Sequence, residues 1–258
     1  MISLKNITKI ADKKRIIDEI NADFPDSAVS LLIAPKNAGK TTFCKVIAGE
    51  LLPDSGKILK KRGDLCAFAD KTGDFFPDFT INECCNIWNL LYPSFNLNTF
   101  DTLVSDSKIS HNTKIQALSP EQKKLLKISL VFSSNAEIMV FDEPLQNLDR
   151  EAKDKTLNLL KEYALNGKTV IVAAEETDDF ESIVSHIFVL NNGDIVLSSG
   201  IKELLLSHRL LPGACTISPD FQVVGPVFNE RLVKTTEDVG RNATLKEIVK
   251  GYINGSST

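Results

Sequence analysis

The strongest constraint on the fold is a continuous apolar run, Val29 to Ile33, that leads into the segment Ala34–Thr42, with the sequence APKNAGKTT. A short apolar run bounded by turn residues is typical of a buried strand in a parallel sheet. The next residues, Phe43 to Leu52, have helical spacing and end at a Pro-Asp-Ser-Gly turn. A strand, a glycine-containing loop and a helix in this order predict an α/β protein.

The loop between that strand and helix contains Gly39, Lys40 and Thr41. Backbone N–H groups at a helix start point toward anions, and the helix dipole favours negative charge there. A lysine can reach the β- and γ-phosphates of a nucleotide, and a threonine hydroxyl can hold Mg²⁺. The strict pattern GxxxxGK[ST] fails at Ala34, which leaves a chance Gly-Lys-Thr as the alternative. The flanking strand and helix favour a phosphate-binding loop.

A second apolar run, Ile138 to Phe141, ends in Asp142 and Glu143. Ligands of open α/β sheets bind at the carboxyl ends of the strands, where this pair would lie. Asp142 is placed to hold Mg²⁺ through water, and Glu143 is placed to polarise an attacking water. On its own, the pair could equally open a surface loop. Together with the phosphate-binding loop, it indicates a nucleotide site.

The remaining patterns give the organisation of the chain. The block from Asp78 to about Ser134 has helical spacing and is interpreted as a helical insertion into the α/β core. A helix is predicted over Arg150–Leu165, a buried strand over Thr169–Ala173, and a hairpin around Asn191-Asn192-Gly193. After about Leu211, Phe221–Val227 and Arg231–Thr235 are expected to pair. A last helix is expected over Thr244–Tyr252 and a disordered tail from Asn254 to Thr258.

Composition excludes several classes of function. The net charge of −4 gives no reason to expect a nucleic-acid partner. No apolar run approaches the roughly 18 residues that span a bilayer, and the first 20 residues do not read as a signal peptide. We therefore expect a cytoplasmic protein. The five cysteines include no CxxC pair and the three histidines are scattered, so no metal site built from protein side chains alone is expected.

The order of these motifs resembles the ATP-binding cassette (ABC) ATPases, the nucleotide-binding subunits of ABC transporters. Leu118–Gln122 (LSPEQ) stands where that family has LSGGQ, and IMVFDEP, which contains the acidic pair, follows at the expected distance. Leu148-Asp149 matches the family's D-loop, and the VLNNGDIV hairpin matches the end of its core. The resemblance covers roughly residues 1 to 207. The remainder looks like the small C-terminal extension of ABC-2-type transporter ATPases.

The resemblance implies an α/β fold of the P-loop NTPase class. It comprises a RecA-like parallel sheet core, an antiparallel β subdomain, an inserted helical subdomain at about 76–134, and a small C-terminal appendage. The expected division is a nucleotide-binding domain over residues 1–210 and an α/β extension over 211–258. The implied partners are transmembrane permease subunits and a second cassette, in a homodimer or heterodimer, with no nucleic acid. The implied location is the inner face of the cell membrane.

The implied cofactors are ATP and Mg²⁺. The implied catalytic residues are Glu143 and Glu175, the latter at the position of the family's switch histidine. The metal ligands would be Thr41 and Asp142, with Asp70 as a further candidate. ATP would lie between Lys40 of one chain and the signature motif of the other. The implied nucleotide-binding residues are Ala34, Pro35, Lys36, Asn37, Ala38, Gly39, Lys40, Thr41, Thr42, Ser119 and Asp149.

The sequence also departs from the family pattern within the motifs. In the phosphate-binding loop, Ala34, Lys36 and Asn37 replace Gly, Asn and Gly. Asparagine tolerates left-handed backbone angles best among non-glycine residues, so Asn37 is a mild change, whereas Ala34 would cost about 1 kcal/mol if it were left-handed.

Four further departures lie at positions that act on nucleotide in the family. The aromatic that usually stacks on adenine aligns near Ala11, and the glutamine that usually touches Mg²⁺ aligns with Asp70 or Lys71. Pro120 and Glu121 replace both signature glycines, which removes one backbone N–H and adds a negative charge. Glu175 cannot donate to a γ-phosphate unless it is protonated.

Two interpretations of function follow. The chain either hydrolyses ATP to drive transport, or acts as a non-catalytic or weakly catalytic partner of a second, active cassette. A chromosome-structure or DNA-repair ATPase of the same superfamily would carry long coiled coils between Lys40 and Leu118, and the 78 positions present are too few. Phe75 and Phe76, within Asp74–Asn82, are expected either to dock a membrane subunit or to lie in the core.

Overall fold

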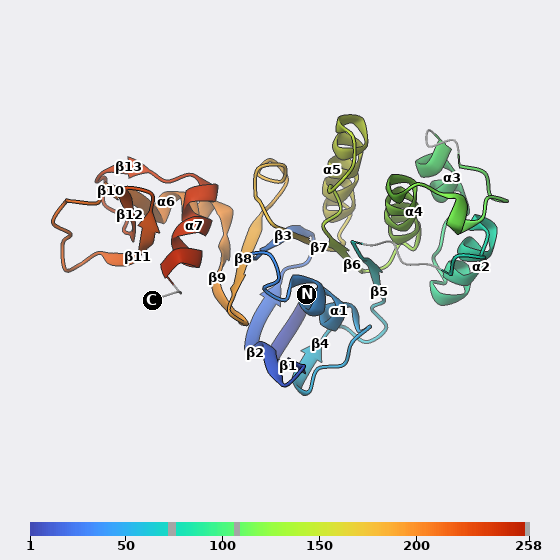
Figure 1. Ribbon diagram of the computed structural model, residues 1–258, viewed down its shortest axis with the longest axis horizontal. Coiled ribbons are helices and arrows are strands. Elements are labelled where there is room, and N and C mark those ends of the chain that lie inside the picture. The colour runs from blue at the N-terminus through green and yellow to red at the C-terminus, as the bar shows by residue number, and fades with distance from the viewer. Residues whose placement is uncertain (72–75, 106–108, 256–258) are drawn as a thin grey trace.

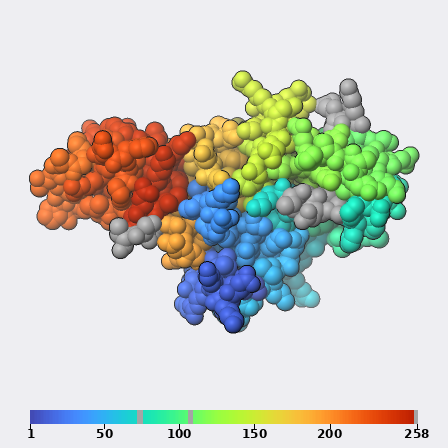
Figure 2. Space-filling view, in the orientation of Figure 1, coloured from blue at the N-terminus to red at the C-terminus, as the bar shows by residue number. Residues whose placement is uncertain are grey.

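The computed structural model describes residues 1–71, 76–105 and 109–255. These residues form a central sheet with three attached parts, which the ribbon and space-filling views show clearly (Figures 1 and 2). The helical subdomain lies at one end of the long axis and the C-terminal extension at the other. An antiparallel sheet from the N-terminal residues lies below the centre of the view.

The central sheet has the strand order β5-β6-β7-β3-β8-β9. All neighbours are parallel except β8 and β9, which form the hairpin predicted around Asn192-Gly193. The strand order places the carboxyl ends of β3, β7 and β6 side by side, so the loops that follow them share one edge. The strands are β3 (Ala28–Ile33), β5 (Cys66–Ala69), β6 (Ile138–Asp142), β7 (Thr169–Ala174), β8 (His186–Asn191) and β9 (Asp194–Gly200).

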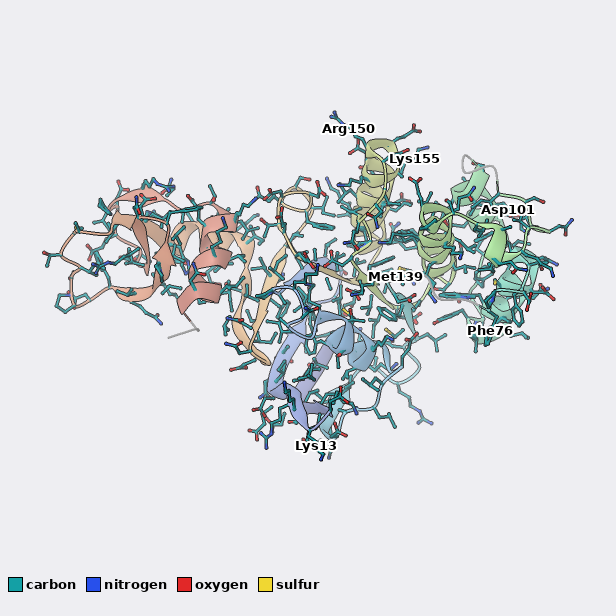
Figure 3. All side chains as sticks on the ribbon, viewed as in Figure 1. Lys13, Phe76, Asp101, Met139, Arg150 and Lys155 are labelled. Atoms are coloured by element: carbon teal, nitrogen blue, oxygen red, sulfur yellow. The ribbon has the colours of Figure 1, made fainter. Side chains whose placement is uncertain are left out.

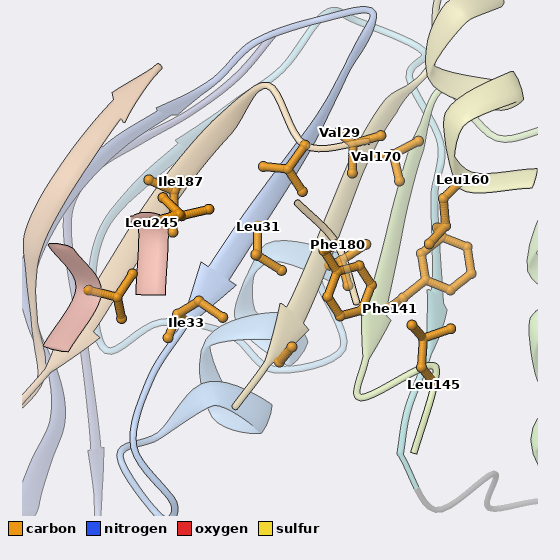
Figure 4. Close-up of a cluster of buried hydrophobic side chains, with 14 of the residues drawn as sticks. Val29, Leu31, Ile33, Phe141, Leu145, Leu160, Val170, Phe180, Ile187 and Leu245 are labelled. Atoms are coloured by element: carbon orange, nitrogen blue, oxygen red, sulfur yellow. The ribbon is translucent and has the colours of Figure 1, made fainter. Parts of the chain in front are cut away.

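Both faces of this sheet are covered, which explains the continuous apolar runs in its strands. In β3, Val29, Leu31 and Ile33 belong to one core, whereas Leu32 belongs to the opposite one. The first core is closed by helix α5 (Arg150–Leu165) and by the C-terminal extension; Figure 4 shows Leu245 beside Ile187. The second core is closed by helix α1 (Lys40–Ala48) and the N-terminal sheet.

The N-terminal antiparallel sheet has the order β2-β1-β4. Its strands are β1 (Ile2–Ala11), β2 (Lys14–Phe24) and β4 (Ser55–Leu59). Phe24 lies at the end of β2 and packs its ring against Phe188 of the central sheet, with ring centroids 4.4 Å apart and the ring planes tilted by 36°. Near the other end of β2, Ile16 lies beside Gly39 of the loop that follows β3.

The helical subdomain comprises α2 (Ile81–Leu91), α3 (Leu97–Val104), a short 3₁₀ helix (Ile115–Ala117) and α4 (Pro120–Ser133). It has its own small core, which includes Ile81, Phe100 and Leu126. The helices start at well-defined caps: Thr80 and Glu83 form a capping box at α2, as do Ser119 and Gln122 at α4. Phe76 lies at this end of the molecule (Figure 3).

The C-terminal extension is a sheet of order β11-β12-β10-β13 packed on helix α7, and α6 contacts α7 and β9. His208 at the start of β10 is buried; its Nδ1 donates to the Leu204 carbonyl (3.0 Å), and its Nε2 is hydrogen-bonded with the Tyr252 hydroxyl (3.1 Å). It thereby joins α6, β10 and α7. The elements are α6 (Ile201–Ser207), β10 (His208–Pro212), β11 (Gln222–Val227), β12 (Glu230–Lys234), β13 (Arg241–Asn242) and α7 (Leu245–Gly255).

The predicted α/β fold, with its parallel core and antiparallel additions, is confirmed, and so is the pairing of β11 with β12. Several boundaries differ. Helix α1 ends at Ala48 rather than Leu52, because Gly49 takes a left-handed φ of 81°. Helix α7 extends to Gly255, so Asn254 is helical instead of disordered; residues 256–258 lie outside the described residues. Strand β10 (His208–Pro212) includes residue 210, after which we placed the division between domains; that division stays a prediction.

Candidate functional site

A cavity of about 410 Å³ opens at the shared carboxyl edge of β3, β6 and β7. It collects residues from the phosphate-binding loop, the start of α1 and the acidic pair after β6, together with residues from β2 and from the ends of β5 and β7. Its lining residues are Ile16, Lys36, Asn37, Gly39, Lys40, Thr41, Thr42, Lys71, Asp142, Glu143, Gln146 and Glu175.

The loop before α1 owes its shape to two left-handed residues. Gly39 has a φ of 94°, and a Cβ there would lie 2.8 Å from Cγ2 of Ile16. Asn37 has a φ of 63°, so this asparagine occupies a left-handed position where glycine is normally favoured. Ala34 does not take a positive φ and is fully buried, so the strain considered for it does not arise. The Ala38 amide closes the loop by donating to the Pro35 carbonyl at 3.1 Å.

Lys40 is held at the first position of α1 and is only 7% exposed. Its ammonium donates to the carbonyl oxygens of Ala34 (2.8 Å) and Pro35 (3.4 Å). It also lies 3.6 Å from Glu143 Oε1 and 3.9 Å from Glu175 Oε1. Ala34 and Pro35 therefore contribute by orienting Lys40 through their carbonyls, and they do not line the cavity.

Thr41 and Asp142 meet across the cavity floor, where the Thr41 hydroxyl donates to Asp142 Oδ2 at 2.6 Å. Asp142 is 1% exposed, and its Oδ1 accepts no hydrogen bond from the part of the chain that is described. Burial raises the pKa of Asp142, and the hydrogen bond from Thr41 and the charges of Lys71 and Lys40 oppose that rise. A hydroxyl beside a buried carboxylate with an open oxygen is a suitable ligand set for Mg²⁺.

Glu143 follows Asp142 in a left-handed conformation, with a φ of 51°. Its amide donates to the Ala173 carbonyl at 2.9 Å, and its own carbonyl accepts from Lys124 Nζ at 2.8 Å. Burial raises the pKa of the Glu143 carboxyl; the Lys40 ammonium lowers it and the Glu175 carboxylate raises it further. The predicted base thus lies in the cavity beside Lys40.

Glu175 and Lys71 line the same cavity at positions where the family pattern has histidine and glutamine. The alignment left Asp70 and Lys71 as alternatives, and Lys71 is the one at the cavity. Asp70 was a candidate metal ligand, but its Oδ1 lies 3.4 Å from Lys127 Nζ and it is not among the lining residues.

Ser119 and Asp149, both predicted to bind nucleotide, do not line this cavity. Each begins a helix instead: the Ser119 hydroxyl accepts from the Gln122 amide at 3.1 Å, and Asp149 Oδ1 accepts from the Ala152 amide at 2.8 Å. Glu121 Oε1 accepts from the Asp149 amide at 3.4 Å, which links the signature segment to the D-loop segment.

Sequence reasoning missed Ile16, Gln146 and Lys124. Ile16 supplies an apolar wall where no aromatic is available, and Ala11, the aligned position, is exposed and lies outside the cavity. Ile16 lies beside the loop only because of how the N-terminal sheet packs, and that packing cannot be predicted from the local sequence. Gln146, three residues after Glu143, had no motif of its own to mark it.

Comparisons with known proteins agree with this geometry. Residues 17–146, half of the chain, match the family model described as ABC transporter. ABC transporter G family member 20 of Dictyostelium discoideum is 26% identical over 224 residues, which cover 80% of this chain. The chain spans only 30% of that relative's length.

Three solved structures show the same fold. The ATP binding subunit of an ABC transporter aligns with a TM-score of 0.71 and 17% identity, covering 79% of this chain and 91% of that one. The dimeric ATP-binding cassette MJ0796, bound to ADP and Pi, aligns with a TM-score of 0.68 and 20% identity, covering 78% and 99%. A candidate cobalt transport ATP-binding protein, cbiO-2, aligns with a TM-score of 0.71 and 22% identity, covering 98% and 100%.

The third of these structures also aligns with the extension, since it covers nearly the whole chain. No helix within the described ranges is long and apolar enough to cross a membrane. Together, the motif order, the cavity and the matched family model lead to one conclusion: this chain belongs to the ABC transporter family, with the fold of an ATP-binding cassette.

Proposed function

We propose that this chain binds Mg-ATP in the cavity and serves as the ATP-binding subunit of an ABC transporter, coupling ATP binding and hydrolysis to transport by separate membrane subunits. One observation carries the proposal: Lys40, Thr41, Asp142 and Glu143 come from two distant motifs and line one cavity at the carboxyl edge of the sheet. The cavity also has the size of a small-ligand site.

The side chains divide the chemistry between them. Lys40 and the amides at the start of α1 bind the β- and γ-phosphates, and Glu143 orients a water whose oxygen attacks the γ-phosphorus while the bond to ADP breaks. Thr41 and Asp142 are placed to hold Mg²⁺, which supplies positive charge against the phosphate oxygens when bound. Most of the rate would come from positioning and electrostatics.

The site needs a second cassette. Because Ser119 and Asp149 lie outside their own chain's cavity, we propose that they face nucleotide in a partner cassette, in a head-to-tail homodimer or heterodimer. The membrane permease subunits would hold the dimer at the inner face of the membrane. The dimeric state of MJ0796 supports the arrangement by analogy of fold.

A weakly catalytic or non-catalytic partner cassette is the second candidate function. Glu175 favours it, because its carboxylate lies 3.9 Å from Lys40 and would repel phosphate oxygens. Pro120 favours it as well, since it occupies the first turn of α4 and has no N–H to offer a partner's γ-phosphate.

Calorimetry with Mg-ATP tests the shared part of both candidates. Lys40→Ala removes a charge-assisted contact worth about 1.5–3 kcal/mol, so affinity should fall about tenfold or more. Lys45→Ala is the matched control, because Lys45 lies on the same helix and outside the cavity. Equal affinities of wild type and Lys40→Ala would overturn the site assignment.

Phosphate release separates the two candidates. An enzyme should reach a rate near 1 s⁻¹ or above, falling sharply in Glu143→Gln. A partner cassette should bind Mg-ATP yet release phosphate no faster than Glu143→Gln when it is alone. In that case, adding an intact second cassette should restore turnover to the pair.

A further inference from the structure

Lys124 is a buried lysine that the proposed chemistry does not yet use. It lies in the second turn of α4, two residues after the signature segment, and is only 6% exposed. Burial lowers the pKa of its ammonium, and the carboxylates of Glu143, Asp142 and Asp70 oppose that effect. A buried ammonium is costly unless it is paired and hydrogen-bonded, so its partner matters.

That partner is the main chain of Glu143. Lys124 Nζ donates to the Glu143 carbonyl oxygen at 2.8 Å, while the Glu143 amide donates to the Ala173 carbonyl at 2.9 Å. The two peptide groups on either side of the Glu143 Cα are therefore held by different elements, α4 and β7. Between them the residue takes a φ of 51°, a left-handed conformation that costs a non-glycine residue roughly 1–2 kcal/mol.

This conformation decides where the carboxylate points. With both peptide groups held, the Glu143 side chain enters the cavity and its Oε1 lies 3.6 Å from Lys40 Nζ. If the carbonyl lost the Lys124 donor, only the longer hydrogen bond from the Gln146 amide (3.3 Å), within the same loop, would remain. The strained φ would then lose the restraint that α4 supplies.

We propose that Lys124 is a positioning residue for hydrolysis: it fixes the backbone of Glu143, and through it the carboxylate that orients the attacking water. The inference rests on the proposed ATP hydrolysis for its kinetic consequence, but the restraint on the backbone is independent of it. Because Lys124 is on the signature helix, any movement of α4 also moves the donor that holds the base. The chain thus has a direct link between the helical subdomain and its own acidic pair.

The test uses the purified chain with three variants. Lys124→Met keeps the length and bulk of the side chain but removes the donor, and Lys124→Arg restores a charged donor. Lys123→Met is the matched control on the same helix, because within the described ranges no hydrogen bond or ion pair joins its side chain to Glu143. Hydrogen exchange of the peptide that contains Glu143 reports the restraint directly, and calorimetry and phosphate release report binding and turnover.

We expect faster exchange at the Glu143 amide in Lys124→Met, wild-type exchange in Lys123→Met, and recovery in Lys124→Arg. Mg-ATP affinity should change less than threefold, whereas phosphate release should fall about 10- to 100-fold, since a displacement of about 1 Å has effects of that size. In a Glu143→Gln background, Lys124→Met should have no further effect, because the carboxylate through which it acts is gone.

Two results would overturn the proposal: unchanged exchange at Glu143 in Lys124→Met, or the same fold loss of rate with and without the Glu143 carboxylate. If Lys124→Met does not fold, Lys124→Gln, which is polar but too short to reach the carbonyl, takes its place in every comparison. If wild type is no faster than Glu143→Gln, the proposed hydrolysis fails, and the exchange result still decides the positioning role.

Discussion

At the scale of single residues, the phosphate-binding loop shows which departures from the family pattern matter to the backbone. Asn37 has a φ of 63°, so the expectation that it stands in for a left-handed glycine holds. Ala34 lies outside the left-handed region, so its Cβ is tolerated in the core. The loop therefore keeps its shape with one glycine, Gly39, and one asparagine.

Substitutions at Asn37 should reveal this backbone requirement. Asn37→Ala should lower the free energy of unfolding by about 1 kcal/mol, because alanine gains no local hydrogen bond to offset the left-handed strain. For a chain of this length that corresponds to about 2–4 °C in Tm, measured by calorimetric melting. Asn37→Gly should melt at or above the wild-type temperature. Lys36→Ala is the control, since Lys36 has no positive φ, and an equal loss there would contradict the argument.

Residues such as Lys40, Thr41, Asp142 and Glu143 could be predicted from sequence, because each ends a buried strand or begins the helix after it. Lys124 could not. Its role depends on a contact between a helix of the inserted subdomain and a main-chain carbonyl, and a lysine in a helix gives no signal that it is buried. Asp70 and Lys71 stayed alternatives because both follow the end of β5, and the sequence does not show which of the two side chains lines the cavity.

At the scale of elements, helix α4 explains how the signature segment keeps its helix without glycines. Proline is favourable in the first turn, where no intrahelical N–H is needed, and Ser119 and Gln122 cap each other. The signature segment is thus a stable helix start, in which the backbone N–H groups of Ser119 and Gln122 are used by the cap of the same helix. This is a structural reason to expect weak stabilisation of a partner's γ-phosphate.

Restoring the family residues tests that expectation. The triple variant Pro120→Gly, Glu121→Gly and Glu175→His should release phosphate faster than wild type. The gain should exceed the product of the single gains, since all three positions act on one phosphate. The gain should vanish when Glu143→Gln is added. A triple variant that forms dimers with ATP but gains no rate would shift the cause to Ala11 and Lys71.

His208 gives the extension a dependence on pH. Burial lowers the pKa of His208; the hydrogen bond to the Leu204 carbonyl and the charge of Glu203 raise it, and Lys234 lowers it. The folded state therefore binds fewer protons than the unfolded state, whose His208 has an ordinary pKa near 6.5. Stability is complete above that pH and falls as the pH drops from 6.5 toward the lower, folded pKa.

Melting between pH 7.5 and 5.5 checks this sign. Wild type should lose more stability across that range than His208→Gln, whose side chain does not titrate. His186→Gln, on β8, should keep the wild-type slope. Parallel curves of melting temperature against pH for wild type and His208→Gln would show that the pH dependence of stability does not come from the burial of His208.

The order of helices and strands was largely predictable, because buried strands of a parallel sheet appear in the sequence as apolar runs. The ends of helix α5 were also marked, by Asp149 before it and Gly167 after it. Of the ends that differed, Ala48 is set locally by the left-handed Gly49, whereas the end at Gly255 depends on tertiary packing. Helix α7 continues through Asn254 because its side chain donates to the Pro226 carbonyl at 2.9 Å, a contact between distant residues.

At the scale of the whole molecule, the helical subdomain presents exposed apolar side chains at the end farthest from the extension. Phe76 is 70% exposed and packs its ring on Phe79, with centroids 4.9 Å apart. For Phe76 the core alternative is therefore wrong; Phe75 lies outside the described residues. The position of Phe76 leaves docking of a membrane subunit as our prediction.

Phe76→Asp should leave ATP affinity and Tm unchanged, because the side chain is mostly exposed. It should abolish co-purification with the membrane subunits co-expressed with the chain. Phe228→Asp is the matched control: Phe228 is 82% exposed and lies on the extension, at the other end of the molecule. A loss of binding in both variants, or in neither, would rule out a specific contact at Phe76.

The shared core of the sheet and the extension also sets an order of events during synthesis. Leu245 and Ile248 of α7 pack in the same core as Val29 and Leu31 of β3, although more than 210 residues separate them. A ribosome therefore completes every strand of the central sheet before it makes the helix that covers part of one face. Until α7 has left the ribosome, that apolar surface remains exposed to water and to other nascent chains, and chaperones would be needed most in that interval.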